Sequence, residues 1–141
     1  MSVATSGVAI GLGCDRGTPL ATVLQALYDA LAQAGLSRAQ VRVLASIEAK
    51  SDELAFLELA KAGGWPLCFF SAAELAVVQV PNPSETVLRY MGTPSVSEAA
   101  ALLAAGAQAD QLLVEKFKHQ GVDGKNATIS IARMTHDRDC F

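Results

Sequence analysis

Val8-Ala9-Ile10-Gly11-Leu12-Gly13-Cys14-Asp15-Arg16-Gly17-Thr18-Pro19 is the stretch that decides the fold of this chain. Its first five residues form a short apolar run that ends in glycines, which predicts a buried strand. Thr18 offers an N-cap oxygen, and Pro19 suits the first position of a helix, where a missing N–H costs nothing. Apolar residues then recur at helical spacing as far as Gly35. The stretch therefore predicts a strand, a glycine loop and a helix in direct succession.

The same order of elements repeats further along the chain. Residues 41–47 predict a second strand, and a second helix is expected to begin near Ser51 and to end at Gly63-Gly64. Residues 65–70 predict a third strand, after which Ser71 is expected to cap a short helix. Strands that alternate with helices favour a parallel sheet covered by helices.

The middle of the chain predicts a loop and two helices. The prolines within 80–84 cannot continue a helix or a central strand, so we expect a surface loop there and a short helix over 85–90. Ser95 and Glu98 have the spacing of a capping box, with the glutamate reaching back to the cap. They begin an alanine-rich helix that is expected to end near Gly106.

Two strands joined by a short polar segment are expected at the end of the chain. Residues 112–116 and 127–132 are apolar enough for strands, and the short connection favours an antiparallel hairpin. The predicted fold is α/β, a three-layer α/β/α sandwich around a mixed, mostly parallel sheet of about five strands.

Composition predicts one globular domain. The chain has 141 residues, of which 51% are hydrophobic and 18% charged, with a net charge of −3. Its mean hydropathy of +0.30 is far from that of a disordered chain. We expect one domain over residues 1–133 and a polar, flexible tail over 134–141.

Charge and patterning exclude several kinds of partner. The sequence shows no basic stripe for nucleic acid, and no apolar run approaches the ~20 residues that a membrane-spanning helix needs. Its N-terminus lacks the pattern of a signal peptide. The three cysteines are odd in number and widely spaced, which favours a reducing cytoplasm over a disulfide framework.

The glycine loop after the first strand is a candidate anion site. Gly11, Gly13 and Gly17 are spaced one residue too widely for a dinucleotide fingerprint, and no Gly-Lys-Ser/Thr follows to make a phosphate-binding P-loop. Backbone N–H groups between a strand end and a helix start still suit an anion, and Arg16 adds a cation. A tight turn with a solvated arginine is the alternative.

Two later junctions between elements have similar chemistry. The second contains Ser46, Lys50 and Glu53, where Lys50 is expected to face an anionic ligand or to pair with Glu53. The third junction, which also starts a helix, is rich in turn formers and hydroxyls. Its candidate residues are Gly92, Ser95 and Glu98. At both junctions the alternative to a ligand site is that these residues only cap the helix that follows. In an open α/β sheet such junctions converge beyond the strand ends, with Lys116 of the hairpin as a further candidate.

Catalytic groups are harder to assign. Cys14 in the glycine loop is a candidate nucleophile and Glu53 a candidate acid or base, but no histidine lies near Cys14 in the sequence. A small half-buried cysteine is the alternative. His136, Asp137, Asp139 and Cys140 are of metal-ligand types, yet they lie on the tail without a second cluster, so we expect no metal.

The three junctions, taken in order, resemble the cobalamin-biosynthesis family formed by CobE and the C-terminal domain of CbiG. The resemblance extends from about Gly7 to Arg133. It is carried by residues 11–17, 46–53, 92–101, 113–116 and 127–133. It implies an α/β fold and a role in building the corrin ring of vitamin B12. In this family CbiG is associated with opening a δ-lactone on a cobalt-precorrin, and stand-alone CobE with the aerobic route.

The resemblance and the residues agree on the type of ligand. Corrin intermediates carry many acetate and propionate groups around a flat apolar ring, which suits a rim with Arg16 and Lys50. The leading hypothesis is therefore a cytoplasmic protein that binds or carries a precorrin intermediate, without a cofactor. An enzyme acting on a precorrin, or a non-catalytic module that docks a pathway enzyme, are the alternatives. The sequence leaves a homodimer open.

Overall fold

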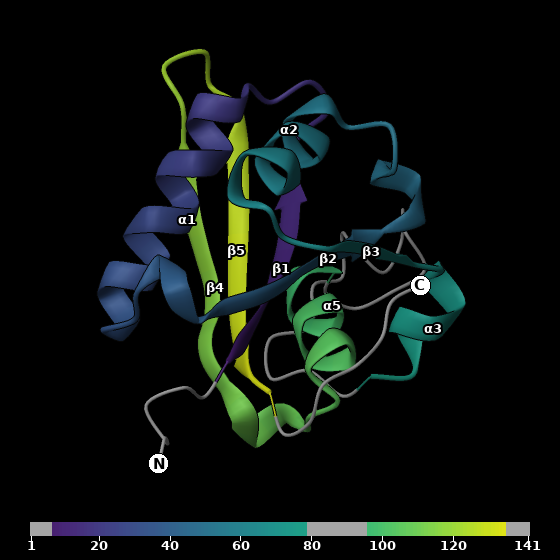
Figure 1. Cartoon of the computed structure of the whole chain (residues 1–141). Coiled ribbons are helices and arrows are strands. Elements are labelled where there is room, and N and C mark those ends of the chain that lie inside the picture. Colours follow the sequence, from purple (N-terminus) through teal and green to yellow (C-terminus); the bar gives the residue numbers. More distant parts are fainter. Residues whose placement is uncertain (1–6, 79–95, 135–141) are drawn as a thin grey trace.

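The protein is a five-stranded sheet between two layers of helices (Figure 1). A computed structural model describes residues 7–78 and 96–134. The strands are β1 (Val8–Cys14), β2 (Val41–Ile47), β3 (Leu67–Phe70), β4 (Leu112–Gln120) and β5 (Asn126–Arg133). The α-helices are α1 (Leu20–Ala34), α2 (Leu54–Gly63), α3 (Ala72–Ala76) and α5 (Val96–Ala105). Short 3-10 turns are η2 (Arg38–Gln40), η3 (Glu48–Lys50) and η4 (Ala109–Gln111).

Strand order in the sheet is β3-β2-β1-β5-β4. β1 pairs with β2 and β2 with β3 in parallel, because a helix crosses over between each pair. β5 returns directly from β4 and pairs antiparallel with both β4 and β1. The predicted mixed α/β sheet of five strands is confirmed, with its pairs divided equally between the two directions.

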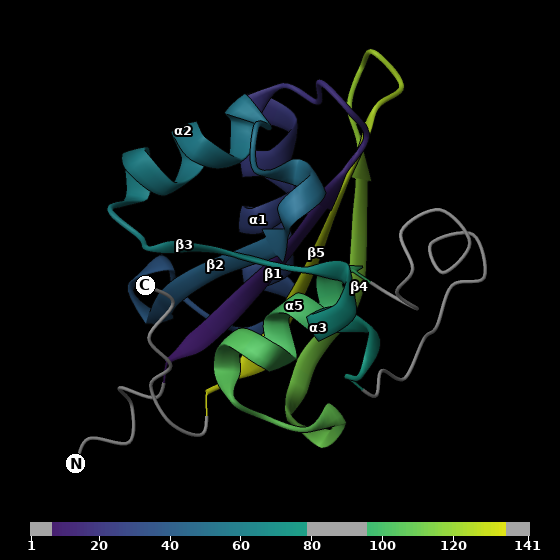
Figure 2. The same cartoon turned by 90° about the vertical axis from the view of Figure 1, so that its right-hand side faces the viewer.

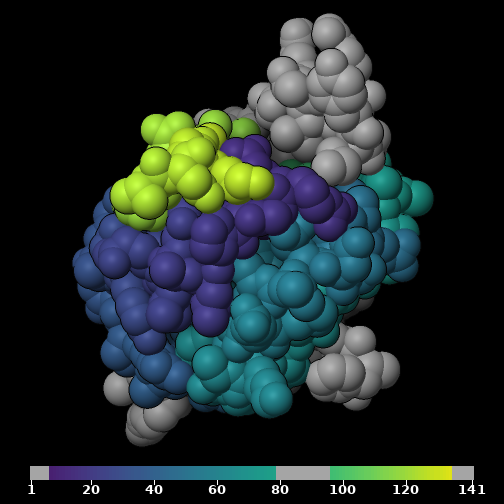
Figure 3. All heavy atoms as spheres, turned by 90° about the horizontal axis from the view of Figure 1, so that it is seen from above, coloured from purple at the N-terminus to yellow at the C-terminus, as the bar shows by residue number. Residues whose placement is uncertain are grey.

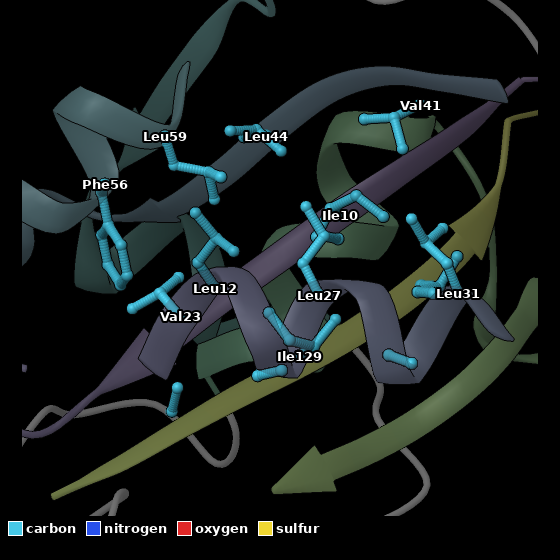
Figure 4. Close-up of a cluster of buried hydrophobic side chains, with 14 of the residues drawn as sticks. Ile10, Leu12, Val23, Leu27, Leu31, Val41, Leu44, Phe56, Leu59 and Ile129 are labelled. Carbon is cyan, nitrogen blue, oxygen red and sulfur yellow. The ribbon is translucent and has the colours of Figure 1, made fainter. Parts of the chain in front are cut away.

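One face of the sheet carries large side chains. Ile10 and Leu12 of β1 point to the same side as Leu44 and Ile129, where α1 and α2 pack on them (Figure 4). Phe56 of α2 is fully buried in this cluster. The alternation of β1 thus directs its bulky residues toward two helices.

The opposite face carries small side chains. Ala9, Gly11 and Ala45 lie beneath α5, which is itself rich in alanine (Figure 2). A Cβ placed on Gly11 would lie 1.8 Å from the carbonyl oxygen of Ser97. Only glycine at this position allows α5 to lie so close to β1.

Several predicted boundaries are shifted in the structure. Thr18 does not cap α1, because its hydroxyl donates to the Asp15 carbonyl at 2.6 Å and Pro19 stands at the N-cap. The turn η3 precedes α2, which begins at Leu54 rather than near Ser51. The hairpin strands extend closer to their turn than the apolar runs alone suggested, since the β4–β5 pairing continues through polar residues as far as Gln120 and Asn126.

Some predictions lie outside the described residues. These are the loop over 80–84, the helix over 85–90, the candidate residues Gly92 and Ser95, and the tail beyond Met134. Within the described ranges, no helix combines the length and apolar character needed to cross a membrane.

Candidate ligand site at the strand ends

The loops that follow β1 and β2 meet at the carboxyl edge of the sheet. Arg16, in the β1–α1 loop, donates from Nη1 to Asp52 Oδ1 at 2.6 Å and from Nη2 to the Ala49 carbonyl at 2.9 Å. Its Nη1 also lies 3.0 Å from Glu53 Oε2. The structure therefore brings the first two predicted junctions together, and it engages the arginine in internal contacts.

Glu53 is a buried link between these loops. The residue is 3% exposed, and its Oε1 accepts a hydrogen bond from the Gly17 backbone N–H at 2.8 Å. Gly17 adopts a φ of 77°, in the left-handed region that favours glycine. Glu53 pairs with Arg16 and not with Lys50. Of the two expectations for Lys50, an anionic ligand or an ion pair with Glu53, the second is therefore wrong.

The contact between Arg16 and Asp52 lies at the surface. The hydrogen bond from Arg16 lowers the pKa of Asp52 and raises the pKa of Arg16 itself. With 58% of its side chain exposed, Arg16 is accessible, but its guanidinium is already occupied by two carboxylates and a carbonyl. A ligand would have to compete with these groups for it.

Lys50 lies on the inner side of the same junction. It is the last residue of η3, is 8% exposed, and donates from Nζ to the Cys14 carbonyl at 2.7 Å. Ser46, also buried, donates to the Leu12 carbonyl at 2.8 Å. Both side chains therefore contact the backbone of β1 near its carboxyl end.

Cys14 has a free thiol at the end of β1. Burial is the main cause that raises the pKa of this thiol above its ordinary 9.0, and the nearby Lys50 charge only partly opposes it. The thiol is thus protonated at neutral pH, which weighs against the nucleophile considered from the sequence.

The β4–β5 turn also holds the glycine loop. Asp15 Oδ2 accepts from the Asn126 backbone N–H at 2.8 Å, and Lys125 Nζ donates to the Arg16 carbonyl at 3.0 Å. Figure 3 shows this yellow-green turn lying against the purple β1–α1 segment. Sequence reasoning missed Asp15, Asn126 and Asp52, because the partners of each are far apart in the chain and no local pattern indicates them.

The start of α5 lies on the other face of the sheet. Ser130 Oγ donates to Ser97 Oγ at 2.9 Å, opposite Gly11 in the β1–β5 register. Glu98 follows in the first turn of α5 and is fully buried. Lys116 is not in this group, because it lies on β4, with β5 between it and β1.

A cleft of about 430 Å³ separates the beginnings of α1 and α2. Its charged lining residues are Arg16, Asp52, Glu53 and Glu58, three acids and one base. This excess of negative charge disfavours a ligand with many carboxylates.

The chain has the architecture of the open α/β class, with a glycine loop and helix starts at the carboxyl edge of its sheet. Residues 8–132 match the family described as "Cobalamin synthesis G C-terminus". The chain belongs to this family and is a cobalamin-biosynthesis protein.

Known relatives agree with this assignment. The chain is 40% identical to "Protein CobE" from Sinorhizobium sp over 116 residues, covering 81% of this chain and 75% of the relative. It is 38% identical to "Cobalt-precorrin-5A hydrolase" from Priestia megaterium over 130 residues, covering 92% of this chain. It spans 33% of that relative's length. The crystal structure of CobE, a protein from the cobalamin (vitamin B12) biosynthetic pathway, superposes with a TM-score of 0.74 at 32% identity, covering 94% of both chains.

Proposed function

We propose that this protein binds a precorrin intermediate at the carboxyl ends of β1 and β2. The observation that carries the proposal is the junction of the β1–α1 loop with η3, which holds the Lys50 ammonium at the strand ends. Ligands of open α/β sheets bind at this edge. A precorrin offers carboxylates to such a cation and an apolar ring to the surrounding backbone and side chains.

The names of the relatives support a precorrin as the ligand. Two curated relatives are called cobalt-precorrin-5A hydrolase and probable cobalt-precorrin-5A hydrolase, and the chain spans 33% and 40% of their lengths. Because so much of each hydrolase lies outside the match, hydrolysis itself need not reside in the shared part. Binding, in the aerobic route and in the cytoplasm, is the function that we assign to it.

The same names favour precorrin hydrolysis as a second candidate function. Cys14 and Glu53 are its candidate groups, but burial raises the pKa of the Cys14 thiol. Glu53 Oε1 accepts from the Gly17 N–H, and Oε2 lies 3.0 Å from Arg16 Nη1 without a hydrogen bond among the described residues. These contacts favour binding over catalysis. Conversion of a precorrin by sub-stoichiometric protein would support the enzyme instead.

An exposed apolar pair on α2 supports a protein partner. Leu54 is 70% exposed and Leu57 is 41% exposed. Such a pair suits a second copy of the chain or a pathway enzyme. Gel filtration of the wild type and of Leu54→Ser would reveal a homodimer as a shift in apparent mass.

The test of the binding proposal compares two corrinoids. One carries free acetate and propionate groups, and the other is cobalamin, in which these groups are amides. We expect the first to bind with a dissociation constant of tens of micromolar, roughly −6 to −7 kcal/mol, and cobalamin to bind more weakly. Absorbance titration and co-elution on gel filtration measure both. Absence of binding by the free-carboxylate corrinoid at these concentrations would contradict the proposal.

A further inference from the structure

Lys50 differs from Arg16, the other cation at the junction of the β1–α1 loop with η3, in how its charge is neutralised. Arg16 has two carboxylates within 3.0 Å, whereas Lys50 makes no ion pair within the described ranges. Two of the three acids within three residues of Lys50, Asp52 and Glu53, pair with Arg16. Arg16 thus takes up two of the acidic groups that lie closest to Lys50 in the sequence.

The Lys50 ammonium also has unused hydrogen-bonding capacity. A lysine ammonium has three N–H donors, and in residues 7–78 and 96–134 a single acceptor, the Cys14 carbonyl, contacts this one. The residue is more than nine-tenths buried. A buried charge with one neutral acceptor costs stability, so its retention requires another reason.

The place of this ammonium in the fold supplies that reason. Its Nζ lies at the carbonyl of Cys14, the last residue of β1, where the parallel strands end. The first turn of α5 lies against Gly11 of the same strand, from the other face. The remaining N–H donors of the ammonium can form charge-assisted hydrogen bonds to a carboxylate oxygen.

We propose that the Lys50 ammonium is the anchor for one carboxylate of the ligand, while its third N–H stays on the Cys14 carbonyl. The identity of the ligand in this proposal rests on the proposed function. The contact between the Lys50 ammonium and a carboxylate does not depend on it. The proposal also gives different roles to the two cations predicted for the rim. Lys50 binds the ligand, and Arg16 joins the loops that follow β1 and β2.

The test uses Lys50→Met, with Lys61→Met as the control. Methionine approximates the apolar stem of the buried lysine and removes its charge. Lys61 is an exposed lysine in the last turn of α2, away from the strand ends. Any loss from net charge alone would appear equally in both variants.

The probes are the free-carboxylate corrinoid and citrate, a small tricarboxylate. We expect Lys50→Met to remain folded, with an unliganded Tm at or above that of the wild type, because a buried charge is removed. Corrinoid binding should weaken by about tenfold or more in Lys50→Met and by less than about twofold in Lys61→Met. Citrate should raise the Tm of the wild type and of Lys61→Met but not that of Lys50→Met.

Each outcome separates the anchor from the proposed function. If the corrinoid fails to bind but citrate stabilises the wild type through Lys50, the corrinoid proposal fails and the anchor stands. Equal binding of both probes by Lys50→Met, no effect of citrate on the wild type, or unfolding of Lys50→Met would overturn the anchor. The last result would show that the ammonium serves the fold instead.

Discussion

At the scale of single residues, the junction depends on groups that cross from one loop to the next. Glu53 accepts from the Gly17 N–H while pairing with Arg16, so one buried side chain joins the ends of β1 and β2. Lys50 donates to the Cys14 carbonyl from the inner side of the same junction. The Glu53 contacts tie the glycine loop to the segment that follows β2.

Replacing Glu53 should destabilise the protein. Glu53→Ala leaves the Gly17 N–H without its acceptor, at a cost of about 1–3 kcal/mol in the free energy of unfolding. Glu53→Gln keeps an amide oxygen for that N–H and should cost less. Urea denaturation measures both variants. A free energy of unfolding for Glu53→Ala equal to that of the wild type would show that this link is not needed.

The Cys14 thiol should react slowly near neutral pH. Burial raises its pKa above 9.0, so the thiolate forms only in alkaline solution. The rate of alkylation by iodoacetamide is measured by mass spectrometry of the Cys14 peptide. This rate should rise with pH, and the pH at its midpoint should be higher in the folded protein than in the urea-unfolded chain.

The control for this reaction is Lys50→Met. Lys50 lowers the pKa of Cys14, so its removal should move the alkylation midpoint to still higher pH. A midpoint below that of the unfolded chain would mean that the thiol is activated, and would restore Cys14 as a candidate nucleophile.

At the scale of elements, β1 is asymmetric. Its Ile10 and Leu12 side chains support α1 and α2, whereas Ala9 and Gly11 on the other face admit α5. Gly11 lies so close to the backbone of Ser97 in α5 that any larger side chain at this position would clash with it. The position of α5 therefore depends on Gly11. The start of α5 is thereby fixed against β1.

Gly11→Ala should displace α5. Its Cβ would meet the Ser97 carbonyl, which is backbone and cannot rotate away, so we expect a loss of about 1–3 kcal/mol or more. Gly13→Ala is the matched control on the same strand, since its Cβ would lie 3.7 Å from Thr128 Cβ. We expect that variant to stay within about 1 kcal/mol of the wild type. Thermal unfolding followed by circular dichroism compares them, and equal Tm values would contradict the close approach.

At the scale of the whole molecule, one sheet divides two apolar cores. Leu27 of α1 lies in the core on one face and Leu102 of α5 in the core on the other, and both are fully buried. Each core includes residues of β1, β2 and β5, so neither can form without the strands that the other needs. The two layers should therefore unfold together.

Leu27→Ala and Leu102→Ala test this coupling. Each creates a cavity and should cost about 2–5 kcal/mol. Both should shift a single urea transition, with coincident curves from circular dichroism and from the fluorescence of Trp65, which packs against the first core. Separate transitions in Leu102→Ala would show that the α5 layer unfolds on its own.

Much of the fold could be predicted because its signals are local. The apolar run at β1, the Gly35 stop of α1 and the Ser71 cap of α3 each lie within a few residues of the element they define. The helix α2 begins three residues later than predicted, because Ser51 and Asp52 form a turn and Glu53 has an extended backbone at the N-cap. Local preference does not distinguish one turn of helix from the beginning of a longer one.

The candidate site was predicted less completely. The sequence indicated that Arg16 and Lys50 lie near one edge, and the structure places both there. The sequence could not separate the roles of Arg16 and Lys50, because it does not show whether a charged side chain is solvated or ion-paired. The contact from Asp15 to Asn126 spans 111 positions and leaves no local trace.

The sequence by itself determined the order of strands and helices, the α/β class and the family, because these depend on spacing and pattern along the chain. Only the tertiary structure decided which charges neutralise one another. Pairing depends on distances between atoms from different loops, and a shift of a few ångströms would exchange the partners of Glu53. The division between Arg16, occupied by Asp52 and Glu53, and Lys50, held beside Cys14 without an ion pair in the described ranges, is therefore a property of the folded molecule.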